Sequence, residues 1–282
     1  MLKKDEIRRA VRQAIDDVRR TNPMAPSITN TVTINLVANV QLAIGGSAAM
    51  VYMPDEGEAI SAAGGATYIN MGTILSIYTE TLARTARALH KMKKPWVLDP
   101  VGIGLGSIRM NALKDFKDFP PSIVRGNASE IIALANLWGL ETNVDDAGVR
   151  GVDSTDTVES ARRAAVSLAR FIGGAVAVSG ATDLVTDGAA VVTVSGGSKF
   201  MPMITGAGCS LGGAMAIYAC CATPFIAALT STMMFDFAGR AAEDSDATHG
   251  PGSFQVNFLD ELYRAGAAEV ADMNISVEEA ER

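Results

Sequence analysis

A run of small residues, Thr205-Gly206-Ala207-Gly208-Cys209, lies directly before an apolar stretch from Leu211 to Tyr218 that predicts a helix. Small residues let the backbone approach a ligand and leave consecutive N–H groups pointing in one direction. The positive end of the helix dipole adds to them, so the segment predicts a site for an anion such as a phosphoryl group. A glycine-rich turn packed beneath a neighbouring helix is the alternative explanation.

Polar residues also follow the short apolar runs that predict strands. Asp99 follows residues 96–98, Arg125 and Asn127 follow residues 123–124, and Ser179 follows residues 176–178. Glu130 comes one helical turn after Asn127. Ligands of open parallel sheets bind beyond the carboxyl ends of the strands, so these residues are candidates for one site. Taken singly, a strand-end cap explains Asp99, the helix dipole explains Glu130, and a surface ion pair explains Arg125.

The sequence predicts the sheet that these positions require. Strands are expected at 48–52, 66–71, 95–98, 122–124, 175–178, 183–186 and 190–194. Helices are expected at 3–20, 34–44, around 56–60, and at 74–92, 111–116, 129–138 and 155–172, with a loop at 145–153. The chain from 200 to about 271 is expected to be mainly helical, and 27–30 is expected to be a polar stretch before a helix. Asp187-Gly188 predicts a hairpin.

This alternation predicts one α/β domain over residues 1–282. Its three layers are a mostly parallel central sheet with helices on both faces, and the hairpin forms an antiparallel edge. Residues 1–20 are expected to form an amphipathic helix lying on the domain, because Ile7, Val11, Ile15 and Val18 recur at helical spacing.

Composition excludes several partners. The net charge is −7, and no dense cluster of Lys or Arg could follow a nucleic-acid backbone. Residues 200–235 carry no charge, but glycines and Pro224 interrupt them, which predicts two buried helices and no membrane span. Three cysteines and two histidines show no zinc spacing. The charged N-terminus has no apolar signal core behind it, so a cytoplasmic protein is expected.

Two glycine-containing nucleotide-binding motifs bear on the function. Gly102, Gly104 and Gly106 form G-x-G-x-G, which lacks the third glycine of the dinucleotide-binding pattern, so a nicotinamide-dependent oxidoreductase is only a third alternative. No G-x-x-x-x-G-K-[ST] sequence occurs, which excludes P-loop chemistry.

A set of ordered motifs resembles the hydroxyethylthiazole kinase family of the ribokinase-like superfamily, over about residues 20 to 265. Any one motif is weak, whereas the ordered set is highly specific. The motifs are Ile28-Thr29-Asn30, Asn70-Met71-Gly72-Thr73, Leu98-Asp99-Pro100-Val101-Gly102, Arg125-Gly126-Asn127-Ala128-Ser129-Glu130, Gly151-Val152-Asp153-Ser154, Thr205-Gly206-Ala207-Gly208-Cys209 and Gly250-Pro251-Gly252-Ser253-Phe254.

This resemblance implies a ribokinase-like fold and the phosphorylation of 4-methyl-5-(2-hydroxyethyl)thiazole by ATP and Mg²⁺ in thiamine salvage. It also implies a homotrimer with the thiazole pocket shared between subunits. The implied ATP contacts are Arg125, Ser179 and Asn127, and the implied magnesium partners are Asp99 and Glu130. The implied substrate contacts are Asn30, Met50, Thr73 and Gly206, and the implied catalytic segment is Gly206-Ala207-Gly208-Cys209. Hard carboxylate oxygens suit Mg²⁺, and a guanidinium can fork onto phosphate oxygens.

Cys209 stands where many ribokinase-like relatives have the Asp that accepts the alcohol proton. A thiol pKa falls at a helix N-terminus, so we hypothesise that Cys209, as a partial thiolate, orients or deprotonates the substrate hydroxyl. A small buried residue that caps the helix is the alternative.

The chain also departs from the family pattern. Ala207 replaces the middle Thr of T-G-T-G-C, and Ser179 stands where Thr is usual. A kinase for another small alcohol, such as hydroxymethylpyrimidine, therefore remains open, as does a catalytically silent nucleotide-binding regulatory protein.

Overall fold

The computed structural model describes residues 3–142 and 157–280, and within them nine strands form one sheet in the order β2-β1-β3-β4-β5-β6-β7-β8-β9. All strand pairs from β2 to β6 are parallel, and β7, β8 and β9 are antiparallel to their neighbours. The strands are β1 (Met24–Ile28), β2 (Ser47–Met50), β3 (Thr67–Asn70), β4 (Trp96–Asp99), β5 (Ile123–Asn127), β6 (Ala175–Ser179), β7 (Thr182–Thr186), β8 (Ala190–Ser195) and β9 (Ile275–Glu279).

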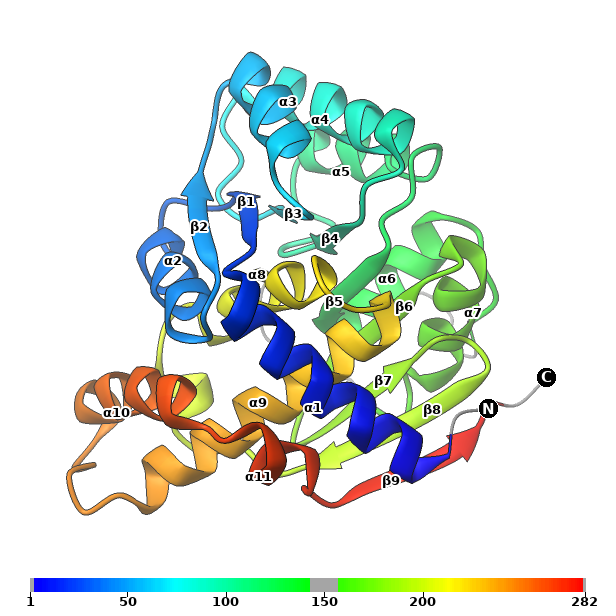
Figure 1. Cartoon of the computed structure of the whole chain (residues 1–282). Coiled ribbons are helices and arrows are strands. Elements are labelled where there is room, and N and C mark those ends of the chain that lie inside the picture. Colours follow the sequence, from blue (N-terminus) through cyan, green and yellow to red (C-terminus); the bar gives the residue numbers. More distant parts are fainter. Residues whose placement is uncertain (1–2, 143–156, 281–282) are drawn as a thin grey trace.

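Helices cover both faces of this sheet (Figure 1). They are α1 (Lys4–Thr21), α2 (Ile34–Ala43), α3 (Pro54–Ala63), α4 (Tyr78–Met92), α5 (Ser107–Asp115), α6 (Ala128–Leu137), α7 (Arg162–Ile172), α8 (Ala207–Ala219), α9 (Pro224–Asp244), α10 (Pro251–Arg264) and α11 (Ala267–Ala271), with a short 3₁₀ helix at Met201–Met203.

Alternation along the strands divides the interior into two hydrophobic layers. Val97 and Ile123 pack with the side chains of α1, α2, α8, α9 and α10 on one face. Their neighbours Trp96, Leu98 and Val124 pack with those of α4, α5, α6 and α7 on the other. Successive side chains of a strand point to opposite faces, so a strand buried on both sides reads as a continuous apolar run.

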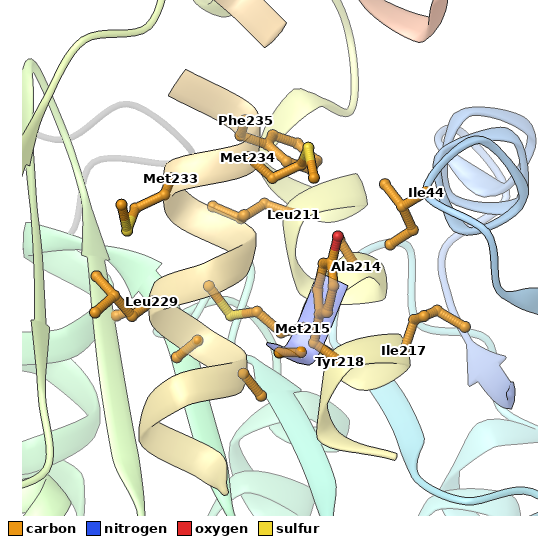
Figure 2. Close-up of a cluster of buried hydrophobic side chains, with 14 of the residues drawn as sticks. Ile44, Leu211, Ala214, Met215, Ile217, Tyr218, Leu229, Met233, Met234 and Phe235 are labelled. Atoms are coloured by element: carbon orange, nitrogen blue, oxygen red, sulfur yellow. The ribbon is translucent and has the colours of Figure 1, made fainter. Parts of the chain in front are cut away.

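Helices α8 and α9 form the centre of the first layer. Their facing side chains, including Met215 and Leu229, are buried against one another (Figure 2). Helix α8 is apolar around its whole circumference, as expected of a helix enclosed on all sides. Pro224 starts α9 at a position where a missing N–H is tolerated. This packing confirms the two buried helices predicted to meet near Pro224, and no helix in the described part of the chain could cross a bilayer.

The predicted fold class, with its mostly parallel sheet and antiparallel edge, is confirmed, and several element boundaries were wrong. Helix α4 begins at Tyr78 and not at residue 74, and α5 begins earlier than predicted, at Ser107. Helix α7 begins at Arg162, whereas the prediction began it at 155. Helix α8 begins at Ala207, so Cys209 lies within its first turn. The predicted loop at 145–153, the first two residues of the predicted helix and the motif at 151–154 lie outside the described residues.

The sequence reasoning missed two strands. The stretch at 27–30, predicted as polar, begins in β1, which lies between β2 and β3. Its sequence, Met-Ala-Pro-Ser-Ile, is poor in β-branched residues, and Pro26 cannot donate a ladder hydrogen bond. For these two reasons the segment does not have the sequence pattern of a strand. The second, β9, pairs with β8 and extends the antiparallel edge to the end of the described chain.

Candidate active site

Asp99 ends β4 and lies at the centre of a buried hydrogen-bond network. Its register partner on β3 is Asn70, so both side chains reach the same edge of the sheet. Asp99 Oδ2 accepts hydrogen bonds from Tyr68 at 3.0 Å, from Asn70 Nδ2 at 3.1 Å and from Arg125 Nη1 at 3.3 Å. Asp99 Oδ1 is buried and has no hydrogen-bond partner among the described residues. One carboxylate oxygen therefore has three donors, and the other has none among the described residues.

Arg125 crosses from β5 to the neighbouring strand. Besides Asp99, its guanidinium donates from Nη2 to Ser179 Oγ at 3.1 Å. Burial disfavours its charge, but Asp99 and Glu130 outweigh that effect and hold its pKa above the usual value. Burial also raises the pKa of Asp99, against the opposing charge of Arg125. An isolated buried charge would be far more unfavourable, so the two groups depend on each other.

Glu130 and Asn127 open α6 with a reciprocal capping box. Asn127 Oδ1 accepts from Glu130 N at 2.9 Å, and Glu130 Oε2 accepts from Asn127 N at 2.9 Å. Burial, and then the charge of Asp99, raise the pKa of Glu130 to about 7. Glu130 therefore caps its helix and also shares an electrostatic environment with Asp99 and Arg125.

The predicted anion-binding segment forms the first turn of α8. Gly206 is the N-cap, with φ of 95°, and a Cβ there would also lie 2.8 Å from Thr33 Cβ. A Cβ on Gly208 would lie 2.6 Å from Arg125 Nη2. The first N–H groups of a helix have no partner within it, so those of Ala207, Gly208 and Cys209 open α8 close to the guanidinium. Positive backbone groups and a positive side chain thus converge on one place.

Cys209 lies on the other side of this helix start, beside Asn30. Asn30 Nδ2 approaches its sulfur at 3.6 Å and also donates to Asn70 Oδ1 at 2.9 Å. Burial, followed by the charge of Asp99, raises the pKa of the thiol, although Arg125 opposes the shift. This shift is opposite in direction to the one that the hypothesis of a partial thiolate requires, because desolvation and a nearby carboxylate both disfavour the thiolate.

A cavity of about 770 Å³ adjoins the helix start. The predicted residues Arg125, Ser179, Ala207 and Gly208 line one part of it. The remaining lining residues come from β7, from the β6–β7 and β8–α8 connections, and from α8 and α9. They are Gly180, Ala181, Asp183, Gly196, Gly197, Ser198, Lys199, Met201, Pro202, Leu211, Phe235, Asp236, Arg240 and Glu243.

The other predicted substrate residues lie at the same edge of the sheet. Asn30 is buried after β1, and its Oδ1 accepts from the backbone of Val32 and Thr33. Met50 is half-buried at the end of β2, in register with Ser27 of β1. Thr73 is exposed, with a left-handed φ of 42°, beyond β3. The structure thus joins Asn30 to Cys209 by a direct contact and places Met50 and Thr73 farther along the same edge.

Sequence reasoning gave no role to Tyr68, Asn70, Asp183 or Asp236. The signal for the first two was present, because residues two apart on a strand share a face and Asn70 ends β3 just as Asp99 ends β4. Asp236 interrupts a long uncharged stretch that was interpreted only as buried helix.

Comparisons with known proteins identify the family of this chain. The model of the hydroxyethylthiazole kinase family matches residues 15–267. A hydroxyethylthiazole kinase from Bifidobacterium longum subsp. infantis is 49% identical, over 96% of this chain and 92% of the relative. The structure of the Pyrococcus horikoshii hydroxyethylthiazole kinase superposes with a TM-score of 0.83 at 29% identity, covering 96% of this chain and 99% of that one.

A more distant structure shows how far the architecture extends. A ribokinase-like superfamily protein from Enterococcus faecalis has a TM-score of 0.62 at 13% identity, covering 95% of this chain and 96% of that one, and it shares the fold alone. The fold is thus ribokinase-like, and with the family match and the near-complete coverage of a relative at 49% identity, this chain belongs to the hydroxyethylthiazole kinase family.

Proposed function

We propose that this protein transfers the γ-phosphoryl group of ATP to the primary hydroxyl of 4-methyl-5-(2-hydroxyethyl)thiazole, a step of thiamine salvage. The oxygen of the alcohol forms the new bond to phosphorus, the bond from phosphorus to the β-phosphate oxygen breaks, and the hydroxyl proton is released. Membership of the family and the names of its relatives support this reaction.

The observation that carries the proposal is the approach of Gly208 to Arg125. The N-terminus of α8 and the guanidinium meet at one part of the cavity, with the Cβ position of Gly208 only 2.6 Å from Arg125 Nη2. Backbone N–H groups and a guanidinium stabilise the charge of a phosphoryl group in transfer. ATP would occupy the cavity with its phosphates here, held by Arg125 and Ser179, while Asn127 orients Glu130 through the capping box.

Asp99 and Glu130 fit a magnesium ion. Within the described parts of the chain, Asp99 Oδ1 is buried without a partner. Burial together with the Asp99 charge raises the pKa of Glu130 to about 7, so a cation nearby would relieve both groups. No cluster of three or more His, Cys, Asp or Glu occurs among residues 3–142 and 157–280, so phosphate oxygens and water would complete the coordination, as Mg²⁺ prefers. When bound, the metal supplies positive charge to the phosphate oxygens.

The alcohol would lie on the Cys209 side of the helix start. Asn30 Nδ2 contacts the sulfur of Cys209 and donates a hydrogen bond to Asn70 Oδ1. Gly206, Met50 and Thr73 would form the rest of the thiazole pocket. Because burial keeps the thiol protonated, Cys209 would orient the hydroxyl by hydrogen bonding and would not act as a base. A loose transition state requires positioning more than deprotonation, so this role is sufficient.

We further propose a homotrimer that shares its thiazole pockets and works in the cytoplasm, where ATP is supplied. Val32, two residues from Asn30, is 65% exposed, and an exposed apolar side chain so near the proposed pocket suits a subunit contact. Sedimentation of a monomer at micromolar concentration would count against the trimer, and cell fractionation tests the location.

A direct assay tests the reaction. Purified protein with Mg²⁺ and ATP is given the thiazole alcohol and, in parallel, hydroxymethylpyrimidine, and phosphorylated products are identified by mass spectrometry. We expect the thiazole phosphate to form with the higher kcat/KM. A preference for the pyrimidine would reassign the substrate, and ATP binding without transfer to either alcohol would favour a regulatory nucleotide-binding protein.

A further inference from the structure

Asp236 presents an unpartnered carboxyl to the cavity. It lies on α9 and is only 8% exposed, yet it lines the cavity. No residue that the structure describes gives its carboxyl a hydrogen bond or an ion pair. Buried polar groups almost always have a partner, because leaving one unpaired is unfavourable. The cavity is the direction from which a partner can come.

The backbone opposite Asp236 makes room for this carboxyl. A Cβ on Gly197, where φ is 72°, would lie 3.0 Å from Asp236 Oδ1, and one on Gly196 would lie 3.1 Å from Asp236 Cβ. Side chains at these two positions would therefore press on the carboxyl. With glycine at both, the β8–α8 connection passes close to α9 and leaves the acid facing the cavity.

The charged groups are ordered along the cavity. Arg125 and Gly208 mark the phosphate end. Asp183 follows on β7, two strands from Arg125 on β5, and its Oδ1 accepts from Gly180 N at 2.7 Å, next to the Ser179 that Arg125 contacts. Asp236 comes next, because it packs against Gly196 and Gly197, which follow β8, the strand beyond β7. Arg240, whose side chain is 67% exposed, lines the cavity one turn farther along α9, toward solvent.

This order places Asp236 beyond the phosphates of a nucleotide and before the open end. Phosphate oxygens only accept hydrogen bonds and repel an ionised carboxylate, and under the proposed function they would already have Arg125 and the start of α8 as partners. The sugar that follows them carries hydroxyl donors. Burial and the charge of Asp183 raise the pKa of Asp236 to about 8, so the empty site holds a largely neutral acid that does not repel an arriving triphosphate.

From the burial, the missing partner and the position along the cavity, we propose that Asp236 binds the sugar hydroxyls of the nucleotide and makes this enzyme selective for ribonucleoside over deoxyribonucleoside triphosphates. The inference rests on the proposed function, because that function places the phosphates at Arg125 and Gly208.

Calorimetric titration with ATP, 2′-deoxy-ATP, 3′-deoxy-ATP and ITP tests this role. We expect the wild type to bind ATP about tenfold more tightly than at least one deoxy analogue, the effect of one hydrogen bond to an ionisable group. Asp236→Ala should bind ATP and both deoxy analogues equally, with the weaker affinity. The control is Asp260→Ala, an exposed acid on α10 outside the cavity lining, which should keep the wild-type preference.

Other outcomes would overturn the proposal. A wild type that does not distinguish ATP from either deoxy analogue, or an Asp236→Ala variant that still does, removes the sugar contact. A variant that loses discrimination between ATP and ITP, and keeps it for the sugar, places Asp236 at the base. If Asp236→Ala does not fold, Asp236→Asn replaces it, and its discrimination should fall at least threefold.

The two proposals fail separately. Sugar discrimination without phosphorylation of an alcohol contradicts only the proposed function. Phosphorylation without sugar discrimination contradicts only the role of Asp236. Failure to bind any of the four nucleotides would contradict both.

Discussion

Substitution of Gly208 by Ala tests the central geometry most directly. The added methyl would lie 2.6 Å from Arg125 Nη2 and 2.7 Å from Nη1, closer than real side chains approach. The guanidinium cannot simply move away, because Arg125 is buried and bonded to both Asp99 and Ser179. One of these bonds must lengthen, or the start of α8 must shift.

The expected size of both effects follows from the displacement of the Arg125 guanidinium. Overpacking of a buried site destabilises by about 1–3 kcal/mol, and we expect a loss of unfolding free energy in that range. If Arg125 no longer meets the transferring phosphoryl group, kcat/KM for ATP should fall about 100-fold, which corresponds to about 2.7 kcal/mol of transition-state stabilisation. The fall in activity should therefore exceed what partial unfolding at the assay temperature explains.

Steady-state kinetics and urea unfolding of the same preparation measure both effects. Gly252→Ala is the matched control, because Gly252 lies in α10, a Cβ there meets nothing within 4 Å, and alanine in a helix is favoured by up to about 1 kcal/mol. We expect this control to be as active as the wild type and slightly more stable. If Gly208→Ala keeps kcat/KM within twofold of the wild type, the proposed contact between α8, Arg125 and the phosphate is refuted.

Three further substitutions probe the surroundings of that contact. Cys209→Ser should lower kcat less than tenfold and leave the shape of its pH profile unchanged, because burial raises the pKa of the thiol and keeps it protonated; loss of an ionisation seen in the wild type would restore the base role. Tyr68→Phe should reduce the unfolding free energy by about 1–3 kcal/mol and kcat/KM about tenfold, because it removes a donor to Asp99 and the acceptor of Asn70; unchanged values in both assays would contradict the network. Asp236→Asn should stabilise the protein by about 2 kcal/mol or more at pH 8 and little at pH 4, as urea unfolding at both pH values will show; equal effects would argue against it. The sign follows because burial raises the pKa of Asp236 from the usual 3.8 to about 8 in the folded protein. Between these two pH values only the unfolded chain loses the proton, so the unfolding free energy of the wild type falls by about 1.4 kcal/mol per pH unit. The buried amide of the variant has its own desolvation cost, which offsets part of the stability that the substitution gains.

The sequence was sufficient to predict where the site lies on the fold. Asp99, Arg125 and Ser179 each follow a short run of buried β-branched or aliphatic residues, and such runs are recognisable without any tertiary information. Once the sheet is parallel, its topology brings those strand ends together, and the observed contacts of Arg125 with Asp99 and with Ser179 confirm it. Their roles toward ATP and Mg²⁺ stay predictions.

The features that the sequence did not predict depend on contacts between residues that are distant in the chain. The helix dipole acting on Cys209 is local and visible, whereas burial beside Asp99 arises only when β4 and α8 pack, and it reverses the direction of the pKa shift. Tyr68 has the pattern of a core residue, and only the register with β4 reveals its hydroxyl as a partner of Asp99. Strand β1 was missed because pairing on both sides sustains a segment whose own propensity is poor.

Two incompletely satisfied carboxyl groups remain in the ligand-free protein. Asp99 Oδ1 has no partner among the described residues, and neither has the Asp236 carboxyl, while burial raises the pKa of both acids. Each would gain a partner from a different part of the proposed ligand, Asp99 from the metal and Asp236 from the sugar. Because a ligand that binds only the folded state stabilises it by mass action, Mg²⁺ and ATP together should raise the melting temperature more than the sum of their separate effects. The missing hydrogen-bond partners of these two carboxyl groups therefore indicate where the nucleotide and its metal should bind.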